Sequence, residues 1–286
     1  KELPLHTALT AEMLIGHVPD DKEGKVPFGF SQYGPAKTRT DRLAMELKRL
    51  MKARGQHCRW VTSRDKALSS VVVEQNGLVT KGADFALLPK DDKLLVGRTL
   101  AVQPFKELSG RDFGRPGRDD RSGMLPPKLA QIMINLACPA FAADTVLFDP
   151  YCGSGTVLTE ALLMGARRVV GLDISERALK DSEDNIVWTK QNSALADFSF
   201  DLFRNAARQA DRLLSPASVD AIVTEPYLGP QRGAFDMGRV KKELEGLYSQ
   251  SLEVFARLLK PQGRIAMVWP VFSRGDHLNF LAPSFP

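Results

Sequence analysis

Between residues 145 and 271 the sequence alternates short apolar runs with longer amphipathic segments. The apolar runs, which we expect to be strands, cover residues 145–151, 168–174, 198–203, 219–224 and 263–271. The amphipathic segments between them, expected to be helices, cover residues 156–164, 175–191 and 240–259. Strands that are apolar along nearly their whole length and alternate with helices are typical of a parallel sheet covered on both faces. The alternation therefore predicts an α/β domain with a doubly wound sheet over residues 122–286.

Composition excludes several other classes of protein. The 286 residues are 43% hydrophobic and 26% charged, which is the balance of a soluble globular protein. No uninterrupted run of about 18 apolar residues is present, so we expect no transmembrane helix and no membrane partner. The first residues lack the apolar core of a signal peptide. The three cysteines, Cys58, Cys138 and Cys152, show no CxxC spacing. We therefore expect a cytoplasmic protein with neither a disulfide framework nor a metal site.

The basic residues are concentrated near the N-terminus. Residues 35–66 contain ten basic and three acidic side chains, a net charge of +7, whereas the whole chain carries +5. The apolar spacing of Leu43, Leu47, Leu50 and Met51 predicts a helix in the middle of this stretch. Its charge is equally compatible with a solvated helix face and with contacts to phosphates. The candidate RNA-binding residues are Lys37, Arg39, Arg42, Lys48, Arg49 and Lys52.

The rest of the N-terminal part reads as a small α+β unit over residues 1–105. Strands are expected at 68–75, 78–88 and 94–102, and Asn76-Gly77 is typical of a hairpin turn between the first two. Residues 106–121 are rich in glycine and in both charges, so we expect a linker or ordered loop whose arginines pair with its own acids.

Pro126-Pro127 then predicts the start of a helix. Its expected apolar face consists of Leu129, Ile132, Met133 and Leu136.

A glycine-containing loop joins the first strand of the predicted sheet to a helix. Asp149 ends the apolar run, and Gly153 and Gly155 follow it closely. Ligands of open α/β sheets bind at the carboxyl ends of the strands, where glycine lets the backbone approach them. A second acid, Asp173, ends the next strand 24 residues after Asp149, close to the spacing of acids that bind ribose hydroxyls. The pattern predicts a nucleoside-containing cofactor, although a purely structural turn has the same local sequence.

Two cofactor classes use this arrangement. Dinucleotide sites require a small third residue in GxGxxG/A, but here that position is Leu158. Asp149 would repel a pyrophosphate but could accept a hydrogen bond from a cationic amino group. No Gly-Lys-Ser/Thr follows, which excludes a Walker A loop. The residues therefore favour S-adenosylmethionine.

A second constellation follows the strand at 219–224. Glu225, Pro226 and Tyr227 place an acid, a rigid turn and an aromatic ring at another carboxyl end. The lone pair of an exocyclic amino group is delocalised into its base, so acceptors are needed to hold the nitrogen as it attacks a methyl group. Glu225 and the Pro226 carbonyl could be those acceptors, with Tyr227 stacking on the base. The alternative is an ordinary proline turn with a core tyrosine.

Both motifs resemble those of class I S-adenosylmethionine-dependent amino-methyltransferases. Residues 149–156, Asp-Pro-Tyr-Cys-Gly-Ser-Gly-Thr, look like that family's Asp-Pro-Phe-Cys-Gly-Ser-Gly-Thr loop. Residues 224–227, Thr-Glu-Pro-Tyr, look like its Asp/Asn-Pro-Pro-Tyr motif. The match is closest to the tRNA guanosine-10 N2-methyltransferase group. Residues 123–130 resemble the helix that precedes the sheet in that group. That group captures tRNA with a THUMP domain, and residues 97–103 are similar to the end of one.

The resemblance implies a Rossmann-like, doubly wound methyltransferase sheet and a smaller N-terminal α+β unit that is THUMP-like and binds RNA. It assigns the catalytic pocket to Glu225, Pro226 and Tyr227. It assigns cofactor binding to Asp149, Tyr151, Gly153, Gly155, Thr156, Asp173, Ile174 and Asn205. Asn205 is placed at the adenine amino group, with Asp201 as the alternative for that contact.

The implied reaction is methyl transfer from S-adenosylmethionine to the N2 amino group of a guanosine in tRNA. A DNA adenine-N6 or cytosine-N4 methyltransferase uses the same two motifs and is one alternative. A non-catalytic RNA-binding relative is another, and it rests on Glu225, which stands where the family has Asp or Asn. The sequence does not specify a small activator subunit. Since only residues 273–286 follow the last expected strand, where the family has two more strands, we expect a clipped chain.

Overall fold

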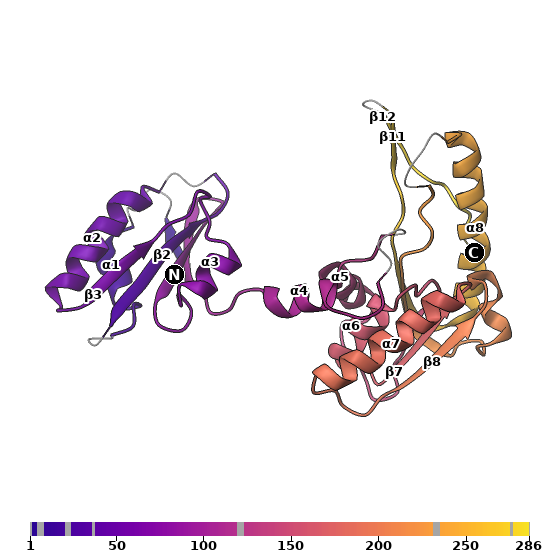
Figure 1. Ribbon diagram of the computed structural model, residues 1–286. Coiled ribbons are helices and arrows are strands. Elements are labelled where there is room, and N and C mark those ends of the chain that lie inside the picture. The colour runs from indigo at the N-terminus through magenta and orange to yellow at the C-terminus, as the bar shows by residue number, and fades with distance from the viewer. Residues whose placement is uncertain are drawn as a thin grey trace. The chain divides into compact units, whose positions relative to one another are not determined.

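The computed structural model describes residues 2–4, 9–20, 24–35, 38–118, 123–230, 235–274 and 277–285. They divide into an N-terminal unit, Lys1–Lys106, and a C-terminal unit, Glu107–Pro286 (Figure 1). The boundary falls within helix α4 (Phe105–Phe113). Among the described residues, no helix combines the length and apolar character needed to cross a membrane.

The described part of the N-terminal unit forms a five-stranded mixed sheet with helices. The strand order is β1-β5-β4-β2-β3, in which β2 is parallel to β3 and β4, and β5 is antiparallel to β4 and β1. The strands are β1 (Glu2–Pro4), β2 (Lys25–Gln32), β3 (His57–Val61), β4 (Ala83–Lys90) and β5 (Lys93–Arg98). The helices are α1 (Ala11–Ile15), α2 (Thr40–Ala53) and α3 (Ser70–Gln75). The core contains Phe28, Leu47, Met51 and Phe85.

Helix α2 confirms the helix predicted from the leucine spacing, and it buries Leu43, Leu47 and Met51. The strand predicted at 68–75 is wrong, because its three valines lie in helix α3. Ser69 caps that helix by accepting a hydrogen bond from the Val72 amide at 3.3 Å. Packing of Val73 against neighbouring apolar side chains outweighs the strand preference of valine.

The hairpin predicted at Asn76-Gly77 is also wrong. Asn76 ends helix α3, and Gly77 takes a left-handed conformation, with φ of 65°, directly after it. A glycine in this conformation is a common helix stop. The following strand, β4, therefore starts at Ala83 rather than at residue 78.

The segment expected to be a linker or loop contains helix α4. Arg111 also does not pair within the segment as predicted, since it forms an ion pair with Glu160 of a later helix at 2.6 Å.

The helix predicted at Pro126-Pro127 is present as α5 (Pro127–Ala137), but a different face is buried. Met133 is buried as predicted, whereas Leu129, Ile132 and Leu136 are exposed. The helix instead buries Ala130, Met133, Ile134 and Ala137. Apolar residues occur on both sides of α5, and the small alanines let one side approach the sheet closely.

The C-terminal unit confirms the doubly wound parallel sheet. Its five described strands have the order β10-β9-β6-β7-β8, and all pairs are parallel. They are β6 (Val146–Asp149), β7 (Arg168–Asp173), β8 (Ser199–Arg204), β9 (Val219–Thr224) and β10 (Leu259–Met267). Two short antiparallel strands, β11 (Phe272–Arg274) and β12 (His277–Asn279), follow.

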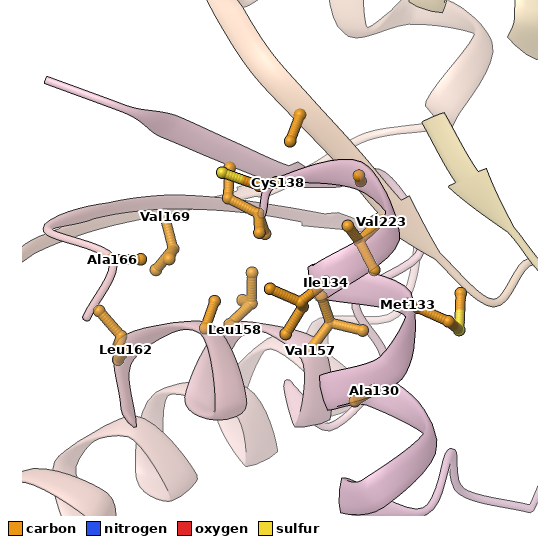
Figure 2. Close-up of a cluster of buried hydrophobic side chains, with 14 of the residues drawn as sticks. Ala130, Met133, Ile134, Cys138, Val157, Leu158, Leu162, Ala166, Val169 and Val223 are labelled. Atoms are coloured by element: carbon orange, nitrogen blue, oxygen red, sulfur yellow. The ribbon is translucent and has the colours of Figure 1, made fainter. Parts of the chain in front are cut away.

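Helices cover both faces of this sheet. Helices α5, α6 (Thr156–Leu163) and α7 (Glu176–Asn192) enclose one apolar cluster, in which Ile134, Leu158 and Val169 meet (Figure 2). The 3₁₀ helix η1 (Ala207–Arg212) and α8 (Met237–Leu258) enclose the other, which contains Phe148 and Phe255. The strand order reverses between β6 and β9, so a ligand crevice is expected at their carboxyl ends.

Candidate functional site

The glycine loop leaves β6 at Asp149 and enters α6 at Thr156. Gly153 and Gly155 have φ of 52° and 80°, which only glycine adopts readily. A Cβ atom at Gly155 would lie 2.9–3.1 Å from atoms of Ser182, so a side chain there is sterically excluded. At Gly153, no atom of the residues that the structure describes, apart from its chain neighbours, lies within 4 Å of the same position. The loop is therefore packed on one side and open on the other.

Asp173 connects the end of β7 to this loop. Its Oδ2 accepts a hydrogen bond from the Gly153 amide at 3.0 Å, and its Oδ1 accepts one from the Ser175 amide at 2.8 Å. The next residue, Ile174, is 71% exposed. A carboxylate beside an exposed apolar side chain suits a ribose whose base lies against Ile174.

Asn205 lies directly after β8, on the same edge of the sheet. Its amide donates to the Asp173 carbonyl at 3.0 Å, and its Oδ1 accepts from the Ala206 amide at 2.8 Å. Asp201 lies inside β8 and forms an exposed ion pair with Arg168 at 3.4 Å. Of the two residues considered for the adenine contact, Asn205 is the one adjacent to Asp173.

Asp149 joins the two predicted motifs. Its Oδ1 accepts hydrogen bonds from Thr224 Oγ1 at 2.6 Å and from the Tyr151 amide at 3.2 Å. Among the residues that the structure describes, no donor lies on Oδ2. Burial, with smaller contributions from Asp173 and Glu225, raises the pKa of Asp149 to about 7. A buried carboxylate without a positive partner fits a site whose cation arrives with the ligand.

The second motif follows β9 as predicted. Glu225 is half-buried, and burial raises its pKa. Pro226 is buried, whereas Tyr227 is 55% exposed. That exposure argues against the alternative reading of a core tyrosine. The Asp149–Thr224 hydrogen bond holds this turn next to the glycine loop, residues 149–156, which we call the cofactor loop from here on.

Helix α8 supplies two residues that the sequence reasoning missed. The Tyr248 hydroxyl donates to the Tyr227 carbonyl at 2.7 Å, and Ser251 Oγ is hydrogen-bonded to the Tyr151 hydroxyl at 2.8 Å. Tyr248 is fully buried, and burial raises its pKa. Since Ser251 lies 100 positions after Tyr151, no local pattern signals this contact.

The Thr156 hydroxyl oxygen accepts a hydrogen bond from Arg115 Nη1 at 2.6 Å. No group of three or more metal-ligating side chains occurs among the described residues.

The predicted RNA-binding residues lie on or beside helix α2 of the N-terminal unit. Arg39, Arg42, Arg49 and Lys52 are exposed and Lys48 is half-buried. Two of them form exposed ion pairs, Arg39 with Asp41 and Arg42 with Glu46, both at 3.1 Å. Exposed pairs of this kind are weak and leave the basic side chains accessible to phosphates. Lys37 lies outside the described residues.

The site fits S-adenosylmethionine part by part. The unpartnered oxygen of Asp149 suits the ammonium of the methionine moiety, and Asp173 suits the ribose hydroxyls. Ile174 follows Asp173 directly and Asn205 follows β8 on the same edge of the sheet. The fit rests on this chain's own donors, acceptors and open space.

Comparisons with known proteins agree with this geometry. Residues 115–273 match the family model described as RMKL-like, methyltransferase domain. A tRNA (guanine(10)-N2)-dimethyltransferase of Methanothermobacter thermautotrophicus is 32% identical over 223 residues, covering 74% of this chain and 60% of the relative. One of the same name from Methanocaldococcus jannaschii is 26% identical, covering 62% and 48%. This chain thus spans about half to three-fifths of those relatives.

A solved structure shows the same fold. The crystal structure of TrmN from Thermus thermophilus aligns with a TM-score of 0.52 at 22% identity, and it covers 94% of this chain and 70% of its own.

Proposed function

Since the chain belongs to the RMKL-like methyltransferase domain family, we propose that it methylates the N2 amino group of a guanosine in tRNA with S-adenosylmethionine. The two relatives named above, both called tRNA (guanine(10)-N2)-dimethyltransferases, support this choice of substrate. The observation that carries the proposal is the 2.6 Å hydrogen bond between Asp149 and Thr224. It joins a nucleoside-binding loop to a turn suited to hold an exocyclic amine.

The residues of the first motif hold the cofactor. Asp149 accepts from the ammonium group, Asp173 from the ribose hydroxyls, and Asn205 binds the adenine edge beside Ile174. Tyr151, Gly153, Gly155 and Thr156 shape the loop around the methionine part. When bound, S-adenosylmethionine supplies an electrophilic methyl group on a sulfonium.

The second motif holds the base. The guanine N2 nitrogen is a poor nucleophile because its lone pair is shared with the ring. Glu225 and the Pro226 carbonyl accept hydrogen bonds from its two N–H groups and favour a pyramidal nitrogen, while Tyr227 stacks on the base. The nitrogen loses one proton as it gains the methyl group, and the half-buried Glu225 carboxylate is placed to take it. The raised pKa of Glu225 suits that role.

We also propose that the N-terminal unit, residues 1–105, is a THUMP-like module that captures the RNA. The charges at Arg39, Arg42, Lys48, Arg49 and Lys52 provide salt-dependent affinity for phosphates that does not depend on sequence. Residues 122–286 then form the methyltransferase domain.

The test is methyl transfer to defined acceptors. The protein is incubated with methyl-labelled S-adenosylmethionine and either bulk tRNA or plasmid DNA, and the labelled nucleoside is identified. Label in N2-methylguanosine of tRNA is expected, and label in DNA alone would refute the proposal. Glu225→Ala should retain cofactor binding and lose turnover, whereas Asp173→Ala should lose binding. Equal loss of binding in both variants would contradict the assigned roles.

A further inference from the structure

The segment that follows helix α4, residues 114–118, is attached to the cofactor loop, residues 149–156. Asn185 of α7 makes the attachment with both ends of its side-chain amide. Its Nδ2 donates to the Ser154 carbonyl and to the Gly117 carbonyl, each at 2.8 Å. Its Oδ1 accepts from the Gly117 amide at 2.8 Å. One buried side chain thus connects the loop at Ser154 with a segment 68 positions away from Asn185.

Arg115 makes a second attachment at the end of the loop. Its Nη1 donates to Thr156 Oγ1 at 2.6 Å, and its Nη2 contacts Met124 Sδ at 3.2 Å. Thr156 is the first residue of α6 and follows Gly155 directly. Only 5% of Arg115 is exposed, and its Nε has no hydrogen-bond partner among the described residues. Burying a guanidinium with an unsatisfied nitrogen costs free energy, so its retention here indicates a specific role.

The packing leaves this segment little freedom. A Cβ atom at Gly117 would lie 2.6 Å from the Asp181 carbonyl oxygen, so the backbone lies directly against α7. Ser182, also on α7, donates to the Gly153 carbonyl at 2.7 Å. Three positions of the loop region, 153, 154 and 156, are therefore each held by a separate buried donor.

We infer that Arg115 and Asn185 are positioning residues for the cofactor loop, and that residues 111–118 are part of the cofactor site rather than a passive connection. The inference rests on the proposed use of S-adenosylmethionine. A loop held before binding does not have to be ordered at the moment of binding, which raises affinity. The coupling is reciprocal, so a ligand on the loop must also stabilise residues 111–118.

The binding experiment uses S-adenosylhomocysteine, which retains the amine, ribose and adenine of the cofactor. Asn185→Ala and Arg115→Gln are each expected to weaken its binding about tenfold by calorimetry. Arg115→Lys keeps one donor for Thr156 and should recover part of the affinity. Asn192→Ala is the matched control, because Asn192 is an exposed residue of the same helix that bonds only to the Trp188 carbonyl.

Hydrogen exchange on the unaltered protein gives a test that does not depend on whether a variant folds. Adding S-adenosylhomocysteine should slow amide exchange at residues 111–118 as well as at 153–156. Slowing confined to 153–156, or variants that fold and bind as tightly as the Asn192→Ala control, would overturn the inference. Failure of the unaltered protein to bind would reject the inference together with the proposed cofactor. Weakened binding in the variants, with no methylation of tRNA by the unaltered protein, would reject only the proposed substrate.

Discussion

The buried carboxylate of Asp149 makes the stability of the C-terminal unit depend on pH. Its pKa is about 7 in the folded protein and 3.8 in an ordinary environment. Between those values the folded protein keeps a proton that the unfolded chain has lost. The contribution of Asp149 to stability is therefore most favourable below about pH 4, falls as the pH rises and levels off above pH 7. Three pKa units correspond to about 4 kcal/mol, an upper bound on this loss.

Asp149→Asn removes the titration and should flatten this dependence. The amide keeps an oxygen for Thr224 Oγ1 and the Tyr151 amide. Its new NH₂ group occupies the position of Oδ2. Because the variant has no charge to bury, the free energy of unfolding at pH 8 is expected to rise, by at most about 4 kcal/mol. Cofactor binding should be lost, because the variant has no negative charge for the ammonium.

Urea unfolding at several pH values between 4 and 8.5 measures this directly. Trp60 lies in the N-terminal unit, and Trp188 and Trp269 lie in the C-terminal unit. A Trp60→Phe background therefore makes tryptophan fluorescence report the C-terminal unit alone. Comparing Asp149→Asn with its parent cancels the contributions of other carboxylates. Equal pH slopes in the two proteins would refute the reasoning.

Further predictions concern the neighbours of the site and the basic helix. Thr224→Val removes a donor from Asp149 and should raise the pKa of that carboxyl further. It should also lower the free energy of unfolding by about 1–3 kcal/mol, measured by urea titration, and an unchanged midpoint would contradict it. Tyr248→Phe removes the hydrogen bond to the Tyr227 carbonyl, in the turn formed by residues 225–227. It should lower kcat about tenfold while the KM for cofactor stays the same. If KM rises instead, the hydroxyl acts on the cofactor loop. Replacing Arg42, Arg49 and Lys52 together with Gln should raise the KM for tRNA. It should also reduce the slope of the logarithm of the tRNA-binding constant against the logarithm of salt concentration by about three, with no effect on cofactor binding.

The parts of the fold predicted correctly from sequence depend on local patterns. The run that ends in Asp149, the glycines after it and the acid at Asp173 lie within one β-loop-α-β stretch, and their spacing determines their placement. The parallel sheet is indicated in the same way, because strands buried on both faces leave a continuous apolar signal in the sequence.

The errors arose where packing decides between locally equivalent choices. The three valines of α3 favour a strand by preference but lie in a capped helix. Helix α5 has apolar residues on two sides, and only contact with the sheet selects the side with Ala130 and Ile134. The bonds made by Asn185 and Tyr248 join positions that no spacing rule connects.

The supports of the cofactor loop also determine when the site becomes complete as the protein is made. Asp149 precedes its partner Thr224 by 75 positions, and Tyr151 precedes Ser251 by 100. At typical synthesis rates of about 5–20 residues per second, the loop leaves the ribosome roughly 5–20 s before Ser251 does. During that interval strands β6 and β7 can pair, but the loop lacks the contacts that close it from α8 and β9. The cofactor is therefore expected to stabilise the complete site only after α8 has been made.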